Sequence, residues 1–312
     1  MIADVGGQGQ LSERMRSEIF APGVLDGRVA LVTGGGTGLG KATALELALC
    51  GARVVIAGRR QEVLEQAVAE IGQSIGAGGE GAGGEGAVGT GTGCGEVGWV
   101  VGDVREAAGA RRLVQEALER HGRLDVLVNN AGGQYFTPAE LIATKGWRAV
   151  WRLNVDGLMN MAQAAFELAF ERAGSGTVVN VTLSPHHGMP GMAHSGAARA
   201  TVEALTRELA VQWGEAGVAV VAVAAGHFET EVLAKYPDSV RAGAARSVPL
   251  QRLGRAQEHA WLVALLASPL GSAFSGSTVT LDGARDNWAG PWPPPGLADE
   301  AGEVPQEERR GG

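Results

Sequence analysis

Residues 31-LVTGGGTGLG-40 decide the fold of this chain. The apolar residues Val29–Val32 predict a short buried strand, and 41-KATALELAL-49 predicts a helix with an apolar face. A strand, a glycine turn and a helix in this order direct free backbone N–H groups at a phosphate. The context on both sides therefore predicts a dinucleotide-binding turn, with a glycine-rich surface loop as the alternative.

The glycines of this turn have separate expected roles. Gly34 permits the turn, Gly38 lets the backbone come close to the phosphates, and Gly40 lets the helix pack on the strand. Thr37 and Leu39 lie between them. We expect all five residues to bind the cofactor.

Composition limits the class of protein. The chain has 312 residues, 45% of them hydrophobic, which suffices for one sizeable α/β domain. Its net charge of −8 and the lack of a basic block argue against nucleic acid as a partner. The two cysteines, Cys50 and Cys94, have no metal-ligand spacing, so we expect no metal site. The N-terminus has no apolar signal region and no apolar run approaches about 18 residues, so we expect neither a secretory signal nor a membrane span.

The second predicted strand, Ala52–Ala57, ends in two basic residues, Arg59 and Arg60. In dinucleotide folds the adenosine ribose lies at this strand end. A carboxylate there suits NAD, whereas a small residue with Arg makes room for a 2′-phosphate and pairs with it. Arg59 and Arg60 therefore favour NADP(H). The alternative is that they are solvated charges that open the next helix, Gln61–Ile75.

The third predicted strand, Val97–Val101, is followed by Asp103 and Val104. We expect Asp103 to accept a hydrogen bond from the adenine amino group and Val104 to lie beside it in the cofactor site. The alternative role of Asp103 is to cap the helix Ala107–Arg120. Before this strand, residues 76–95 are glycine-rich and of low complexity, and we expect a flexible insertion there.

Asparagines mark the end of the fourth predicted strand, Leu124–Val128. Asn129, Asn130, Ala131 and Gly132 follow it directly. Their amide and backbone groups can brace the sheet edge next to a cofactor. We expect the last three of them to bind the cofactor.

The next predicted helix, Trp147–Arg172, contains one polar residue among apolar ones, Asn154. This side chain either helps to order water at the active site or is a satisfied polar group of the core. The polar, turn-rich segment Gly226–Pro249 follows a strand and is the expected substrate lid. The remaining predicted elements are strand Gly176–Val181, helix Met192–Trp213, strand Val218–Ala224, helix Gln257–Ala267 and strand Ser277–Leu281.

This alternation predicts a single doubly wound Rossmann-type α/β domain. Its seven-stranded parallel sheet would carry helices on both faces. We assign residues 1–26 to an N-terminal arm, 27–284 to the domain and 285–312 to a Trp/Pro-rich tail. Since no second domain is expected, the substrate site must come from loops at the edge of the sheet that holds the cofactor.

The glycine turn, Asp103, the 129–132 segment and Asn154, at these intervals, resemble the short-chain dehydrogenase/reductase family from about residue 27 to 284. The resemblance implies a nicotinamide cofactor. Members of that family usually reduce carbonyls with a Ser, a Tyr and a Lys. The Tyr donates the proton, and the Lys, four residues later, lowers its pKa and holds the ribose.

This chain departs from the family at those positions. Ser195 stands where the Tyr belongs, Arg199 stands where the Lys belongs, and the Ser position falls on Thr182 or Leu183. A serine hydroxyl is a far poorer acid than a phenol of pKa about 10. Arg199 keeps the positive charge that holds a ribose but cannot relay a proton. The usual carbonyl chemistry is therefore not expected.

Several separate stretches resemble the peroxisomal trans-2-enoyl-CoA reductases and their bacterial relatives. They are 130-NAGGQ-134, 138-PAE-140, 145-KGW-147, 194-HSGAAR-199 and 286-DNW-288. This resemblance implies NADPH as cofactor, an enoyl-CoA thioester as substrate and a homotetramer. We expect a cytoplasmic location, with the peroxisome as the alternative, because the last residues are not a peroxisomal address.

Reduction of an activated alkene sends hydride to Cβ, places negative charge on the thioester oxygen, and then protonates Cα. The site needs a hydrogen-bond donor at that oxygen, and Ser195, Thr182 and the nicotinamide ribose hydroxyl are the candidates. Tyr236, on the lid, or water would deliver the Cα proton. The three histidines between residues 186 and 194 are expected in loop or helix-start roles. The predicted catalytic set is Asn154, Thr182, Ser195, Arg199 and Tyr236.

Two alternative functions stay open at this point. One is a related oxidoreductase that acts on an alcohol, an aldehyde or a dienoyl-CoA. The other is a nucleotide-binding protein without catalytic activity, which the missing Tyr and Lys would permit. The fold alone does not separate them.

Overall fold

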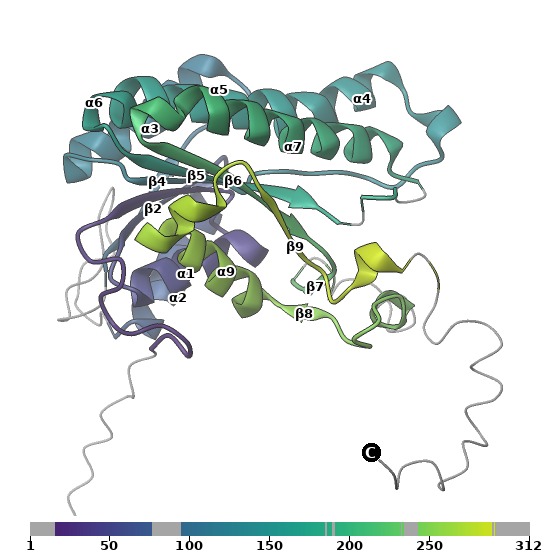
Figure 1. Ribbon diagram of the computed structural model, residues 1–312, viewed down its shortest axis with the longest axis horizontal. Helices are drawn as coiled ribbons and strands as arrows, with labels where there is room; N and C mark the ends of the chain where they lie inside the picture. The colour runs from purple at the N-terminus through teal and green to yellow at the C-terminus, as the bar shows by residue number, and fades with distance from the viewer. Residues whose placement is uncertain are drawn as a thin grey trace, which may run out of the picture.

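The computed structural model describes residues 16–76, 95–184, 186–188, 191–231, 233, 243–288 and 290. A seven-stranded sheet in the order β3-β2-β1-β4-β5-β6-β9 forms its centre, and every neighbouring pair is parallel (Figure 1). The predicted α/β fold is thereby confirmed. The strands are β1 (Val29–Thr33), β2 (Arg53–Gly58), β3 (Val97–Val101), β4 (Val126–Asn129), β5 (Gly176–Leu183), β6 (Val218–Ala225) and β9 (Thr278–Leu281), with a separate pair β7 (Phe228–Glu229) and β8 (Gly254–Arg255).

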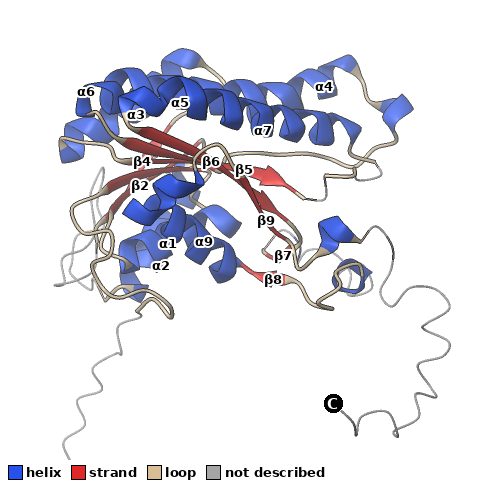
Figure 2. Ribbon diagram, viewed as in Figure 1, coloured by secondary structure: helices blue, strands red, loops and turns tan. Residues whose placement is uncertain are grey.

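Helices cover both faces of the sheet, as Figure 2 shows. One layer holds α1 (Gly38–Leu49), α2 (Gln61–Ser74) and α9 (Ala256–Ala267). The other holds α3 (Ala107–His121), α4 (Thr144–Trp151), α5 (Gly157–Ala165), α6 (Glu171–Ala173) and α7 (Ala193–Trp213). Short 3₁₀ turns lie at Ala139–Leu141, Gly214–Ala216, Pro269–Phe274 and, after β9, at Arg285–Asn287, labelled η7.

The two layers explain why the strands are apolar without alternation. Successive residues of a strand point to opposite faces. In β1, Ala30 and Val32 belong to the core beneath α1 and α9, whereas Val29 and Leu31 belong to the core beneath α3 and α5. All four side chains are almost completely buried, so a central parallel strand needs apolar residues at every position.

The long helix predicted at 147–172 is continuous but not uniform. It runs from Thr144 to Ala173 and is interrupted by two π-helical turns, at Arg152–Asp156 and Phe166–Phe170. In the first of these, Asn154 Nδ2 donates a hydrogen bond to the Val150 carbonyl, 2.7 Å away. This side chain competes with backbone N–H groups for the carbonyl, which accompanies the local change in helix geometry.

Other boundaries differ by a few residues. The first helix begins at Gly38, not Lys41, so the end of the glycine turn is already the first helical turn. The predicted lid contains β7, which pairs with β8, but Tyr236 lies outside the described residues. The predicted arm, glycine-rich insertion and C-terminal tail also lie largely outside them and stay predictions.

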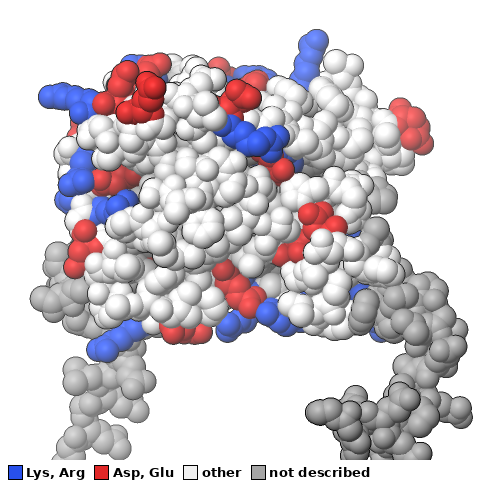
Figure 3. Space-filling view, viewed as in Figure 1, with Lys and Arg blue, Asp and Glu red and all other residues white. Residues whose placement is uncertain are grey.

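Charged side chains of both signs are scattered around the rim of the face in Figure 3, and its centre carries few of them. No helix within the described ranges is long and apolar enough to cross a membrane.

A buried histidine joins the first and last helices. The Nδ1 atom of His259, on α9, lies 3.3 Å from the Thr43 hydroxyl on α1, and its ring packs edge-on against Phe228. The side chain is completely buried, and within the described part of the chain its Nε2 atom has no hydrogen-bond partner. Desolvation lowers the pKa of His259 from 6.5 to about 4.

His259 should make the fold less stable in acid. Between its ordinary pKa of 6.5 and about 4, the unfolded chain binds a proton that the folded chain does not. The free energy of unfolding therefore falls as the pH falls, by about 2 kcal/mol from this group between pH 7 and pH 5. Urea unfolding at both pH values measures the change. His259→Gln should remove most of this contribution, whereas His187→Gln, at an exposed position, should not. An equal pH dependence in wild type and His259→Gln would contradict the account.

Candidate active site

A set of hydrogen bonds ties the glycine turn to the end of β4. The Thr33 hydroxyl accepts hydrogen bonds from the backbone N–H groups of Asn130, at 3.1 Å, and Ala131, at 3.0 Å. In return, Asn130 Nδ2 donates to the carbonyls of Thr33, at 3.0 Å, and Gly34, at 3.2 Å. A Cβ on Gly40 would overlap the Gly34 carbonyl and lie 2.5 Å from Asn130 Nδ2. The close packing expected of Gly40 is therefore present, and Asn130 braces the turn rather than pointing away from it.

The N-terminal turn of α1 is suited to bind a phosphate. Because the helix begins at Gly38, the N–H groups of its first turn have no acceptor within the helix. The Thr37 side chain makes no capping bond, and no acidic residue lies in the first turn. A Cβ built on Gly38 would meet only Thr230, at 3.8 Å, so the space above the turn is open. Thr230 was not anticipated from the sequence; it follows β7 and faces the turn across this space.

The expected adenosine end lies at the ends of β2 and β3. Arg59 and Arg60 are exposed, and neither side chain makes a hydrogen bond or ion pair with another described residue. Asp103 accepts hydrogen bonds from the side chain of Arg105, with Nε–Oδ1 at 2.9 Å, and from its backbone N–H. These hydrogen bonds lower the pKa of Asp103, and the bond from the Arg105 side chain has the largest effect. Burial alone would raise this pKa. The N-cap of α3 is Glu106, so Asp103 does not cap that helix. Its contact with adenine stays a prediction.

Val104, the neighbour of Asp103, is buried, and its carbonyl accepts a hydrogen bond from Asn160 Nδ2 at 3.0 Å. Leu39 is half-buried in the first turn of α1. That both residues bind the cofactor stays a prediction.

Arg199 reaches from α7 to β5 and to the loop after β4. Its Nη1 donates to the Val181 carbonyl at 2.9 Å, and its Nη2 lies so close to Gly132 that a Cβ there would overlap it. Burial lowers the pKa of Arg199 to about 10, so the guanidinium is still charged at neutral pH. No carboxylate of the described residues pairs with it, and its buried Nε atom has no partner there.

Asn154 clamps the loop after β4. Its Nδ2 donates to the Gly133 carbonyl at 2.8 Å, and its Oδ1 accepts from the Gly133 N–H at 3.1 Å. With the bond to Val150 described above, its amide group is fully used inside the protein. Of the two expected roles, the structure displays the satisfied polar group, which orders the loop next to Arg199. A role in ordering water stays a prediction.

Ser195, near the start of α7, is completely buried, and its Oγ has no hydrogen-bond partner among the described residues. The neighbouring His194 is likewise buried, with both ring nitrogens unpartnered there, and its ring lies 4.4 Å from that of Tyr135. Buried polar atoms without partners are rare in native proteins, and an ordered water or a bound ligand can supply the missing partner. A contact of Ser195 Oγ or Arg199 Nε with cofactor or substrate stays a prediction.

The hydroxyl of Thr182 has partners within the protein. It is buried in β5, and its single O–H has two acceptors within reach, the Arg199 carbonyl at 3.2 Å and Glu203 Oε1 at 3.3 Å. Leu183, the other position aligned with the family serine, points to the opposite side of the strand and is apolar. Of the two predicted hydroxyl donors, Ser195 is the one without a partner among the described residues.

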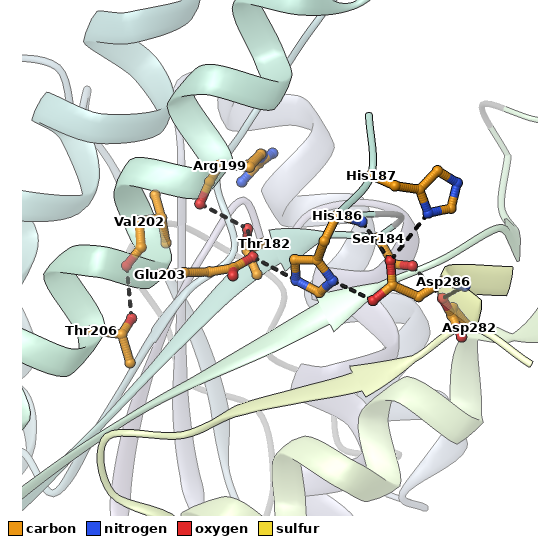
Figure 4. Close-up of polar contacts among 10 residues, drawn as sticks. All are labelled: Thr182, Ser184, His186, His187, Arg199, Val202, Glu203, Thr206, Asp282 and Asp286. Carbon is orange, nitrogen blue, oxygen red and sulfur yellow. Dashed lines mark hydrogen bonds and ion pairs between the residues drawn. The ribbon is translucent and has the colours of Figure 1, made fainter. Parts of the chain in front are cut away.

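Sequence reasoning missed a polar network beside these residues. His186, just after β5, lies between Glu203 on α7 and Asp286 in η7, and Figure 4 shows all three side chains pointing toward one another. The sequence signal was a pair of histidines directly after the strand and a glutamate one helical turn beyond Arg199. No local sequence pattern predicts the contact of His186 with Asp286, because the two residues are far apart in the chain.

An open glycine turn, a switch of strand order between β1 and β4, and a buried cation at the same edge define a nicotinamide-dependent oxidoreductase of the Rossmann class. The "short chain dehydrogenase" family model matches residues 28–81, and the "Enoyl-(Acyl carrier protein) reductase" model matches residues 86–284. The chain belongs to the short-chain dehydrogenase/reductase family.

Relatives whose names state an activity support this assignment. A probable 2,4-dienoyl-CoA reductase of Bacillus subtilis (strain 168) is 35% identical over 274 residues, which is 86% of this chain and 100% of the relative. The peroxisomal 2,4-dienoyl-CoA reductase of Danio rerio is 33% identical, covering 86% of this chain and 84% of its own. Among solved structures, the citronellol catabolism dehydrogenase of Pseudomonas aeruginosa PAO1 matches with a TM-score of 0.72 and 39% identity, over 86% of this chain and 99% of the other.

Gly132→Ala should weaken binding of the dinucleotide. The new methyl group would displace the Arg199 guanidinium and lie 2.8 Å from Asn154 Oδ1. Gly133→Ala is a matched control, because its methyl group would meet only the flexible Leu153 side chain, at 3.2 Å. We expect at least about tenfold weaker binding for the first variant, roughly 1.4 kcal/mol, and little change for the second. Fluorescence titration with a reduced nicotinamide dinucleotide measures both affinities. Equal affinities would show that Arg199 does not contact the cofactor.

Proposed function

We propose that this chain reduces the C2–C3 double bond of a trans-2-enoyl-CoA with NADPH. The observation that carries the proposal is that Ser195 replaces the tyrosine of the family. Its hydroxyl is buried and has no hydrogen-bond partner in the described residues. The buried cation Arg199 lies one helical turn further along α7. Reduction of a ketone must deliver a proton to its oxygen, for which a serine hydroxyl is a far poorer acid than a phenol, whereas an enoyl thioester needs only a hydrogen bond there while negative charge develops.

The residues of the chain divide the task as follows. When bound, NADPH supplies the hydride that reaches Cβ. Ser195 donates its hydrogen bond to the thioester oxygen, and Arg199 adds positive charge in a site where burial strengthens the interaction. Asn154 and Gly132 hold the loop and the guanidinium in place. Tyr236, outside the described residues, stays a candidate donor of the Cα proton.

A second candidate substrate is a 2,4-dienoyl-CoA. The relatives reported above support it, since two of them are named as 2,4-dienoyl-CoA reductases and match this chain over most of its length. The same oxyanion contact would serve both substrates, because both place negative charge on a thioester oxygen. The sequence stretches that resemble trans-2-enoyl-CoA reductases, 194-HSGAAR-199 above all, favour the first candidate.

A panel of substrates tests the proposal. NADPH oxidation, followed by its absorbance, should be fast with crotonyl-CoA, and slow or absent with ketones and aldehydes. Ser195→Ala should lower kcat about 10²-fold or more, the usual cost of losing one oxyanion donor, with little loss of NADPH affinity. A preference for 2,4-hexadienoyl-CoA would select the second candidate. Turnover of ketones alone, or NADPH binding without turnover of any thioester, would contradict the proposal.

The choice of NADPH over NADH rests on Arg59 and Arg60. Both residues are exposed and directly follow β2, at the strand end where the adenosine ribose binds in this class of fold. A guanidinium group can pair with a phosphate through two hydrogen bonds.

Replacing Arg59 and Arg60 together by Ala should weaken NADPH binding about 10- to 100-fold, as expected for the loss of charge-assisted hydrogen bonds. NADH has no 2′-phosphate, so its affinity should change less than about twofold. Arg112→Ala, on the exposed face of α3, is the control. Fluorescence titration with both cofactors gives the affinities, and equal losses for NADPH and NADH would refute the assignment.

We also propose a homotetramer and a cytoplasmic location. Support for assembly comes from α9, whose Trp261, Leu262 and Leu265 are half-buried beside the edge strand β9, and from the face of few charges in Figure 3. Light scattering of the purified protein and imaging of a tagged chain test the two points. A monomeric mass or a peroxisomal signal would contradict them.

A further inference from the structure

The imidazole of His186 is held at both nitrogens by carboxylates. Its Nε2 lies 2.9 Å from Glu203 Oε1, and its Nδ1 lies 2.5 Å from Asp286 Oδ2 (Figure 4). A neutral imidazole has only one N–H to donate, so a ring between two ionised carboxylates is best satisfied as the imidazolium. No cluster of three or more His, Cys, Asp or Glu in the described ranges is arranged to hold a metal ion.

The network has an inner end and an outer end. The inner end is Glu203, 12% exposed, which accepts a hydrogen bond from Thr182; that hydroxyl also contacts the Arg199 carbonyl. The outer end is Asp286, 22% exposed, beside the ring of His187. The hydrogen-bonded chain thus runs from a surface position to the Thr182 hydroxyl, beside the backbone carbonyl of Arg199.

The charges around His186 favour its protonated form. Burial lowers the pKa of His186, but the hydrogen bonds and charges of Asp286 and Glu203 outweigh this effect and raise the pKa above its usual value. His187 faces the same carboxylate from the loop. Asp282 also lies near, accepting hydrogen bonds from the Asp286 N–H at 2.8 Å and from the Ser184 hydroxyl. These are the charged groups around the ring on its own loop, on α7 and on the segment after β9.

We infer that Glu203, His186 and Asp286 form a relay that returns protons from solvent to the active site, with His186 as the positioning and proton-storing residue. The inference rests on the proposed function, in which the site lacks the family phenol. After hydride reaches Cβ, the electron pair of the enolate takes a proton at Cα from a donor in the site. His186 passes its Nε2 proton to Glu203, and Glu203 passes a proton to the water that protonates Cα. The neutral imidazole then takes a proton from bulk water. The net change is one hydride and one proton added across the double bond.

The pH dependence of turnover separates a relay from a purely structural tie. Because the imidazolium is the active form, kcat for crotonyl-CoA should fall as the pH rises through the pKa of His186. His186→Ala should lower kcat at least about tenfold and flatten this fall, and added imidazole should restore part of the rate. His186→Gln serves where the alanine variant is unstable. His187→Ala is the matched control, expected to keep both the rate and the pH profile.

Glu203→Gln tests the inner end. It can still accept the Thr182 hydrogen bond but cannot take up a proton, so it should show the loss of rate without rescue by imidazole. If His186→Ala keeps the wild-type pH profile, or loses rate with an unchanged profile and no rescue by imidazole, the relay is overturned and the network is only a structural tie.

Failure of the proposed function would be recognised separately. If the wild type reduces a ketone but no enoyl thioester, the proposed function falls, and the same pH profiles are measured with that ketone. An NMR titration of the histidine ring protons is independent of turnover. His186 should titrate above pH 6.5 in the wild type and at a lower pH in Asp286→Asn; titration at the ordinary value in both would overturn the relay.

Discussion

The hydrogen bonds between Thr33 and Asn130 are the constraint on which the rest of the site depends. They join the carboxyl ends of β1 and β4, the two neighbouring strands from which the chain winds in opposite directions. Ligands of open α/β sheets bind in the crevice at such a switch point. These bonds hold the glycine turn against the loop after β4, so that the N-terminal turn of α1 stays accessible. They also fix the position of Gly132, against which the Arg199 guanidinium rests.

The second determining feature is the buried charge of Arg199. A buried cation without a carboxylate partner is costly unless ligand oxygens or carbonyls satisfy it. Here it has the Val181 carbonyl and lies against Gly132, while Ser195, one helical turn before it, has a hydroxyl without a partner in the described residues. A site with a strong permanent charge and only a weak acid suits a reaction that forms an enolate. It is poorly suited to one that must protonate an alkoxide in the same step.

Much of this fold could be predicted from the sequence, because buried parallel strands are continuous apolar runs and the glycine turn has a local signature. The two π-helical turns could not, since one extra residue per turn leaves no periodic signal. Asn154 could be placed in its helix, but its clamp on Gly133 depends on a contact across 21 positions. The meeting of His186, Glu203 and Asp286 depends on the packing of a loop, a helix and the segment after β9, which no local pattern encodes.

The fate of the two added hydrogens tests the central claim most directly. Crotonyl-CoA would be reduced with NADPH deuterated at C4, or with unlabelled NADPH in D₂O, and the product analysed by mass spectrometry and NMR. The account predicts butyryl-CoA with the cofactor deuterium at C3 and the solvent deuterium at C2. Deuterium from the cofactor at the carbonyl carbon, or no saturated thioester at all, would contradict it.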